Sequence, residues 1–110
     1  MEDKPEMMHL LQLETRIVGA LKEVYDPEIP VNIYDLGLIY DVHVNDDNSA
    51  TITMTLTAPN CPVADDILLS VKESIEAIDD VKSVAINLVF DPPWSKDMMS
   101  EEAMLELGFL

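Results

Sequence analysis

The segment Thr53–Asp66 reads TMTLTAPNCPVADD and predicts a strand, a tight turn and the start of a helix. Apolar and polar side chains alternate up to Thr57, which is the period of a half-buried strand. A Pro-Asn pair breaks that alternation, and Pro62 suits the first position of a helix, where its missing N–H costs nothing. Cys61, the only cysteine in the sequence, therefore stands at or next to the predicted helix N-cap.

A thiol at a helix start meets free backbone N–H groups and the positive end of the helix dipole, which favour the thiolate. The dipole contributes roughly 0.3–1 kcal/mol, less than one pKa unit at about 1.36 kcal/mol per unit. Asp65 and Asp66 lie in the same predicted turn and oppose a negative sulfur, whereas a bound metal cation would deprotonate it directly. Two interpretations of Cys61 remain: a small buried apolar residue, or a thiolate that acts together with a metal.

The chain carries a formal net charge of −16, from 22 acidic and 6 basic residues. This charge argues against a nucleic-acid groove, which needs clustered lysine and arginine, and disfavours an anionic membrane surface. A solvated acidic surface accounts for it, and a basic partner protein or a cation is the alternative. Apolar residues make up 48% of the 110 residues, so we expect one aliphatic core and a single domain over residues 1–110.

One cysteine leaves no internal disulfide, which indicates a reducing compartment. No apolar run reaches the length of about 18 residues that a membrane-spanning helix requires, and the first ten residues are acidic and polar. We therefore expect neither a membrane span nor a secretory signal, and a cytoplasmic location.

The remaining sequence predicts helix, strand, strand, helix and strand in that order. Apolar residues recur every three or four positions over 6–24, as in an amphipathic helix. Two alternating segments, about 38–44 and 50–57, flank a turn and predict a hairpin. A second amphipathic helix follows the Cys-Pro pair, and a third strand covers about 81–90. This order is typical of an α/β (α+β) fold whose two helices cover one face of a small sheet, with a short C-terminal helix added.

The strand alternation also predicts which side chains face the core. Tyr40 should point inward from the first strand, and Thr55 outward from the second. Leu88 and Phe90 should be buried by the third strand. The apolar tail that begins at Trp94 should dock on the body of the protein or on a second chain.

The loop before the first strand is expected to be ordered, because it carries apolar residues that a flexible linker would lack. Asn32 can cap a short turn, with Asp35 at the third position and Gly37 taking the left-handed exit. Asp26 and Glu28 can cap, bind a cation or remain solvated.

Three blocks, in this order, resemble the SufT/PaaD-like family of iron–sulfur-assembly proteins. They are 26–38, which begins DPEIP and ends DLGL, 56–62, which reads LTAPNCP, and 91–108, which begins DPPWS and ends LG. The resemblance covers nearly the whole chain from residue 14. It implies a small iron–sulfur cluster assembly domain and a role in maturing clusters or delivering them to recipient proteins.

The resemblance also implies roles for individual residues. The functional cysteine of the family falls on Cys61, within the motif that runs from Thr57 to Pro62. Asn60 departs from the small residue, often glycine, expected at its position, but asparagine tolerates left-handed geometry. The implied partner or site surface consists of Asp26, Glu28, Thr57, Asn60, Trp94 and Ser95.

Iron–sulfur clusters are normally held by four cysteine thiolates, and this chain has one. A monomer therefore cannot enclose a cluster, whereas a homodimer would supply two thiolates and leave the rest to carboxylates, small thiols or a partner. The main hypothesis is a non-enzymatic carrier or adaptor in which Cys61 transiently binds iron or an iron–sulfur cluster, or contacts a partner that does. Its partners would be the assembly machinery and recipient apoproteins.

Two alternatives to this hypothesis remain open. In the first, the chain is an interaction adaptor whose Cys61 is structural. In the second, it is a thiol enzyme with Cys61 as nucleophile and His43 as the only plausible base.

Overall fold

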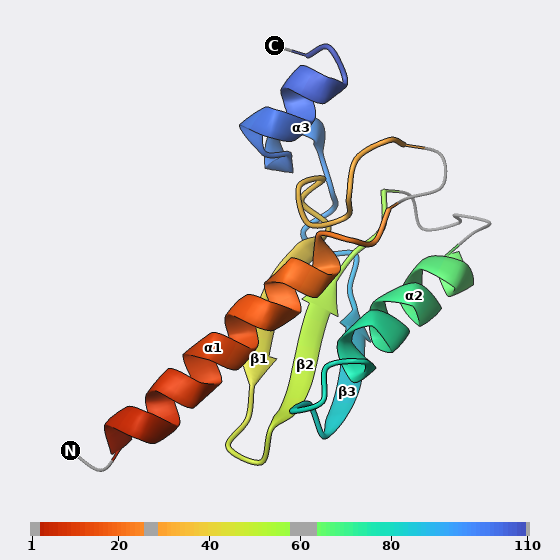
Figure 1. The fold of residues 1–110 in the computed structure, drawn as a ribbon. Helices are drawn as coiled ribbons and strands as arrows, with labels where there is room; N and C mark the ends of the chain where they lie inside the picture. Colours follow the sequence, from red (N-terminus) through yellow and green to blue (C-terminus); the bar gives the residue numbers. More distant parts are fainter. Residues whose placement is uncertain (1–2, 26–28, 58–63, 110) are drawn as a thin grey trace.

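The computed structural model describes residues 3–25, 29–57 and 64–109. Figure 1 shows two long helices on the same face of a three-stranded sheet, and a short C-terminal helix beyond one end of that sheet. No helix in these ranges is long and apolar enough to cross a membrane. The elements are α1 (Asp3–Leu21), β1 (Ile39–Val44), β2 (Ser49–Met54), α2 (Ala64–Glu76), β3 (Ser83–Leu88), a 3-10 turn (Lys96–Met98) and α3 (Glu101–Glu106).

The sheet has the strand order β1-β2-β3 and contains both kinds of pairing. β1 and β2 are antiparallel and joined by the hairpin turn, whereas β2 and β3 are parallel because α2 returns the chain to the same end of the sheet. The predicted α+β class, the order of elements and the short C-terminal helix are confirmed.

The core is aliphatic and lies between the two long helices and the central strand. Its side chains recur three or four residues apart in the helices and two apart in β2, which is why the sequence pattern predicted these elements. Burying each leucine, isoleucine or valine contributes roughly 1.5–3 kcal/mol. The buried residues of these three elements are Leu13, Ile17, Leu21, Ile67, Val71, Ile75, Ala50, Ile52 and Met54.

The expectation that Tyr40 faces the core is wrong, because a β-bulge interrupts the pairing of β1 with β2. The pairing register shifts between Ile39 and Asp41, which leaves Tyr40 as the extra residue. An extra residue reverses the alternation of side chains, so Ile39 packs against the core instead. The Tyr40 hydroxyl donates a hydrogen bond to the Pro92 carbonyl oxygen at 2.8 Å.

The third strand is shorter than predicted, and its last apolar side chains are not buried. Leu88 is 36% exposed and Phe90 is 41% exposed, whereas Val84 and Ile86, earlier in the strand, pack against the core. β3 pairs on one side only among the described strands, so its side chains are less enclosed than those of β2.

The described part of the loop before β1, residues 29–38, forms the turn that the sequence predicted. The Asn32 side chain accepts a hydrogen bond from the Asp35 N–H at 2.9 Å and donates one to the Asp35 carboxylate at 2.8 Å. Gly37 has a φ of 85°, a left-handed conformation that glycine adopts without strain. A Cβ atom on Gly37 would also collide with the Met98 carbonyl oxygen, so the tail packs directly on this turn.

The C-terminal tail docks on the body of the protein. The Trp94 Nε1–H donates a hydrogen bond to the Leu36 carbonyl oxygen at 2.7 Å, and the Ser100 N–H donates one to the Asp35 carbonyl oxygen at 2.8 Å. Met99 is buried in the core. Of the two docking modes expected for the tail, the described residues therefore show the intramolecular one.

Candidate functional site

The described parts of the three sequence blocks lie at one end of the sheet. β1 is antiparallel to β2, so the chain enters β1 where it leaves β2, and β3 leaves the sheet at the same end (Figure 1). The Thr55 N–H donates to the Leu38 carbonyl oxygen and the Val89 N–H to the Met54 carbonyl oxygen, each at 2.8 Å. We call this end, defined by Leu38, Thr55 and Val89, the motif end, and the opposite end, with the turn at 45–49, the hairpin end.

Three of the predicted site residues are described, and all belong to segments at the motif end. Thr57 follows β2 and is half-buried, and Trp94 is half-buried by its contact with the loop. Ser95 is exposed, and its carbonyl oxygen accepts a hydrogen bond from the Met98 N–H at 3.0 Å at the start of the 3-10 turn. The other predicted site residues, Cys61, Asp26, Glu28 and Asn60, lie outside the described residues.

An apolar groove of about 360 Å³ lies beside the indole of Trp94. One wall comes from the loop before β1 and the other from the C-terminal tail. The Lys96 Nζ lies 4.8 Å from the centre of the Phe109 ring, which is a cation–π contact at the side of the groove. The apolar lining residues are Ile29, Pro30, Leu36, Trp94, Met99, Leu107 and Phe109.

Thr55 is a residue at the motif end that the sequence did not single out. The alternation predicts an outward, solvated side chain, but Thr55 is fully buried and no described residue forms a hydrogen bond with its Oγ1. A buried hydroxyl without a partner costs about 1–3 kcal/mol, so few proteins retain one without a reason. The only sequence signal is that the threonine repeat of β2 continues past the end of the strand.

The described residues do not form a metal site by themselves. They contain no group of three or more histidine, cysteine, aspartate or glutamate side chains placed to hold an ion. His43 pairs with Thr51 toward the hairpin end, whereas Thr57, the last described residue before the cysteine segment, follows the motif end. This arrangement disfavours His43 as the base of a thiol enzyme.

A pKa shift occurs at the hairpin end, away from the candidate site. The Asp47 carboxylate accepts hydrogen bonds from the Ser49 hydroxyl at 2.6 Å and from the Ser49 N–H at 3.0 Å. These bonds stabilise the charged form and hold the pKa of Asp47 below its ordinary value of 3.8. The pKa shift arises from hydrogen bonds within the hairpin turn, so it does not indicate a binding or catalytic site.

Comparison with known proteins decides the family. A family model described as "Iron-sulfur cluster assembly protein" matches residues 14–88 of this chain. The chain belongs to this iron–sulfur cluster assembly family.

Two relatives resemble the chain over most of its length. The Porphyromonas gingivalis "Fe-S protein maturation auxiliary factor" is 64% identical over 100 residues, which cover 91% of this chain and 95% of the relative. The Staphylococcus aureus "Fe-S protein maturation auxiliary factor SufT" is 42% identical over 85 residues, which cover 77% of this chain and 97% of the relative. These matches confirm the SufT-like resemblance.

A solved structure has the same fold. The crystal structure of a domain of unknown function, DUF59, from Bacillus anthracis superposes with a TM-score of 0.88 at 39% identity, covering 94% of this chain and 99% of that chain. The region that matches the iron–sulfur cluster assembly model extends from α1 to the end of β3 and stops before Trp94. One wall of the groove therefore lies inside the matched region and the other beyond it.

Proposed function

We propose that this protein is an accessory factor that helps to assemble iron–sulfur clusters or to deliver them to recipient proteins. The observation that carries this proposal is its 64% identity, across nearly the whole of both chains, with a protein named as an iron–sulfur protein maturation auxiliary factor. Relatives of this kind are named as auxiliary factors, which supports a carrier or adaptor rather than an enzyme. The chain would work as one iron–sulfur-assembly-type domain.

In this proposal the cluster, or iron alone, is a transient cargo, and Cys61 is the residue that contacts it. Four thiolates normally hold a cluster, and one cysteine per chain leaves most of those positions to ligands from elsewhere. The described residues offer no ready-made ligand group that would replace them. A second copy of the chain, a small thiol or the partner protein would complete the ligand set, and such shared ligation favours release.

The surface around this cargo would be formed by the motif end. Trp94 and Ser95 leave the sheet there, as does Thr57, and we assign to the same surface the remaining predicted residues, Asp26, Glu28 and Asn60. Its partners would be the assembly machinery and recipient apoproteins. The net charge of −16 would raise the rate of encounter with basic partners more than the final affinity.

Anaerobic reconstitution with ferrous iron and sulfide tests the role of Cys61. Wild-type protein and Cys61→Ser would be compared by visible absorption and by iron and sulfide analysis. Serine keeps the size of cysteine but lacks the soft thiolate, so we expect the variant to lose most of the bound iron and sulfide. Ser70→Ala, a change on the exposed face of α2, serves as a control and should bind as much as the wild type. Equal, negligible binding by wild type and Cys61→Ser would remove the ligand role.

The second candidate function is a protein-interaction adaptor whose cysteine is structural, and the apolar groove beside Trp94 favours it. Phe109 lines this groove and is 51% exposed, whereas Leu105 is 64% exposed and does not line it. If the adaptor function is correct, Phe109→Ser should impair maturation of a recipient enzyme in cells. Leu105→Ser and Cys61→Ala should both leave it intact. Loss of maturation with Cys61→Ala alone would instead favour the thiolate role.

A further inference from the structure

β1 forms an open edge of the sheet, because β2 is its only partner among the described strands. In an antiparallel pair, successive residues direct their backbone groups alternately toward the neighbouring strand and away from it. The Asn45 N–H donates to the Ser49 carbonyl oxygen, so the backbone groups of Asn45 point toward β2. By this alternation, the backbone groups of Val44 and Val42 point away from β2, to the open edge. Such groups can pair with an additional strand.

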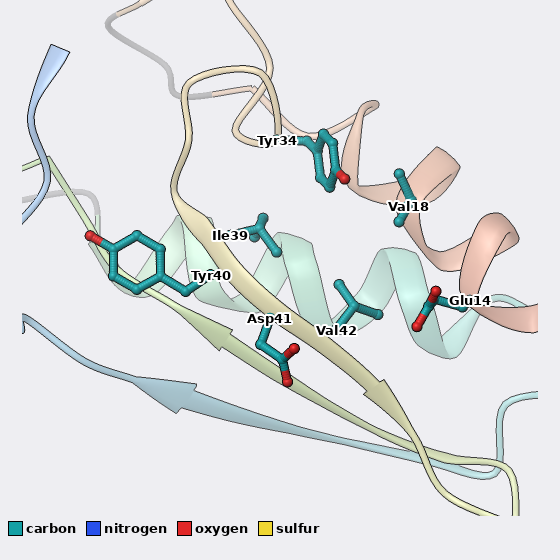
Figure 2. Close-up of a pocket in the computed structure, with 7 residues that line it drawn as sticks. All are labelled: Glu14, Val18, Tyr34, Ile39, Tyr40, Asp41 and Val42. Carbon is teal, nitrogen blue, oxygen red and sulfur yellow. The ribbon is translucent and has the colours of Figure 1, made fainter. Parts of the chain in front are cut away.

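A pocket of about 240 Å³ opens along this edge, between α1 and β1 (Figure 2). On the helix side it is lined by Glu14, Val18, Tyr34, Ile39 and Val42. Figure 2 shows Val42 on the same side of the β1 ribbon as Glu14, while Asp41 points to the opposite side. The edge therefore presents one carboxylate on each face of the sheet.

Both carboxylates lack a cationic partner in the described part of the chain. Glu14 is half-buried and Asp41 is exposed, and the ion pair described in this structure joins Arg16 to Asp80 at 2.6 Å. Apolar side chains beside Glu14 can cover the methylene groups of a long basic side chain, leaving its charged end at the carboxylate. The pocket thus has the chemistry that a lysine or arginine requires.

We propose that an extended segment of a basic partner protein adds to β1 as a fourth strand. Successive side chains of a strand point to opposite faces, so two adjacent basic residues would reach Glu14 on the helix side and Asp41 on the open face. Backbone hydrogen bonds with Val42 and Val44 would supply affinity, and the pocket would supply the preference for a basic side chain. Lys22 marks the far end of the site, because its Nζ lies 5.4 Å from the centre of the Tyr34 ring and would repel a further cation.

Charge and strand geometry favour a basic segment over a second copy of the chain as the additional strand. Two copies paired edge to edge would each bring a net charge of −16 and place like carboxylates near one another, which is destabilising. The bulge at Tyr40 interrupts the strand, so pairing is confined to the short segment after it. The inference does not involve Cys61 and therefore extends beyond the proposed cargo role.

The probe for this site is a capped peptide, acetyl-TVKKVT-amide, titrated into the full ¹⁵N-labelled chain. We expect the NMR signals of the Val42 and Val44 amides to shift and their hydrogen exchange to slow. Removing both carboxylates with Glu14→Gln and Asp41→Asn should weaken binding roughly three- to tenfold, the range expected for two partly exposed ion pairs. Glu73→Gln with Asp79→Asn removes the same charge from exposed positions outside the pocket, and should weaken binding less than about twofold.

A second peptide separates strand addition from charge attraction without altering the protein. N-methylation of its two central amides keeps both lysines but blocks backbone pairing, so binding should be lost. Equal binding of the two peptides, equal weakening in both double variants, or no binding at millimolar concentration would each overturn the proposal. Cys61→Ser should bind the peptide as the wild type does, so failure of the cargo role and failure of this site are distinguishable.

Discussion

The two ends of the sheet are held together by different kinds of contact. At the hairpin end, the turn bonds to itself: the Asn45 side chain donates to the Ser49 hydroxyl at 2.9 Å, and Asp47 accepts two hydrogen bonds from Ser49. At the motif end, the Trp94 indole bonds to the Leu36 carbonyl oxygen, 58 residues away in the sequence. Neighbouring residues make the contacts within the turn, and the Lys82 N–H adds one backbone hydrogen bond from outside it, to the Asn48 carbonyl oxygen at 3.0 Å. The motif end requires the tail to fold back, and the candidate site lies at this end.

Gly37→Ala should have the largest effect, because it disrupts the contact between the turn and the tail. The left-handed backbone disfavours alanine by about 1–2 kcal/mol, and displacement of the Met98 carbonyl adds to this. We expect the free energy of unfolding, measured by urea denaturation, to fall by about 2–3 kcal/mol.

Gly108→Ala is the matched control for this change. Gly108 has a similar φ of 82°, but apart from its chain neighbours no atom of the described residues lies within 4 Å of a Cβ built there. The free energy of unfolding of Gly108→Ala should therefore fall only by the backbone contribution of about 1–2 kcal/mol. Equal losses in the two variants would mean that the packing of Met98 on Gly37 contributes nothing to stability.

Thr55→Val should have a smaller effect of the opposite sign. Valine has nearly the same shape as threonine but no hydroxyl, so the variant no longer buries the Oγ1 that lacks a described partner. We expect the free energy of unfolding to rise by about 1 kcal/mol. Thr51→Val, at a half-buried position within β2, should change the free energy of unfolding by less than about 0.5 kcal/mol. A loss of stability in Thr55→Val would mean that the hydroxyl has a hydrogen-bond partner other than the described residues.

The smallest effect is expected at the hairpin end, from the titration of Asp47. Its pKa is lowered in the folded protein, so its contribution to stability is fully present above the unfolded value and is lost as the pH falls through the folded one. The stability difference between wild type and Asp47→Asn should therefore be constant well above pH 3.8 and shrink below it. An NMR titration of the Asp47 carboxyl carbon should give a pKa below 3.8, and Ser49→Ala should return it toward that value. An unchanged pKa in Ser49→Ala would assign the shift to another cause.

Features that depend on neighbouring residues could be predicted from the sequence. The Asn32 cap with Asp35 forms as expected, as does the left-handed exit at Gly37. Ser100 caps α3 by accepting a hydrogen bond from the Ala103 N–H at 3.1 Å. Each of these contacts spans three to five residues, so the chain segment itself contains all the groups involved.

Features that depend on what packs over a residue could not be predicted. Tyr40 does not face the core, because a bulge in β1 reverses the alternation of side chains there. Leu88 stays exposed, because its strand has one described neighbour. Thr55 continues a polar row and is nevertheless buried. Periodicity reports which residues share a face, but it does not report whether that face is covered.

The same division applies to the candidate site. The order of elements, the aliphatic core and the blocks that contain Cys61, Trp94 and Ser95 can be read from the sequence, because periodicity and turn chemistry act over short distances. The role of Cys61 stays a prediction. The folded chain was needed to show that the described parts of these blocks lie at one end of the sheet, and that an acidic pocket opens on its β1 edge. Strand direction and tail docking determine the first, and the packing of α1 beside β1 determines the second. All of these arise from contacts between residues that are distant in the chain.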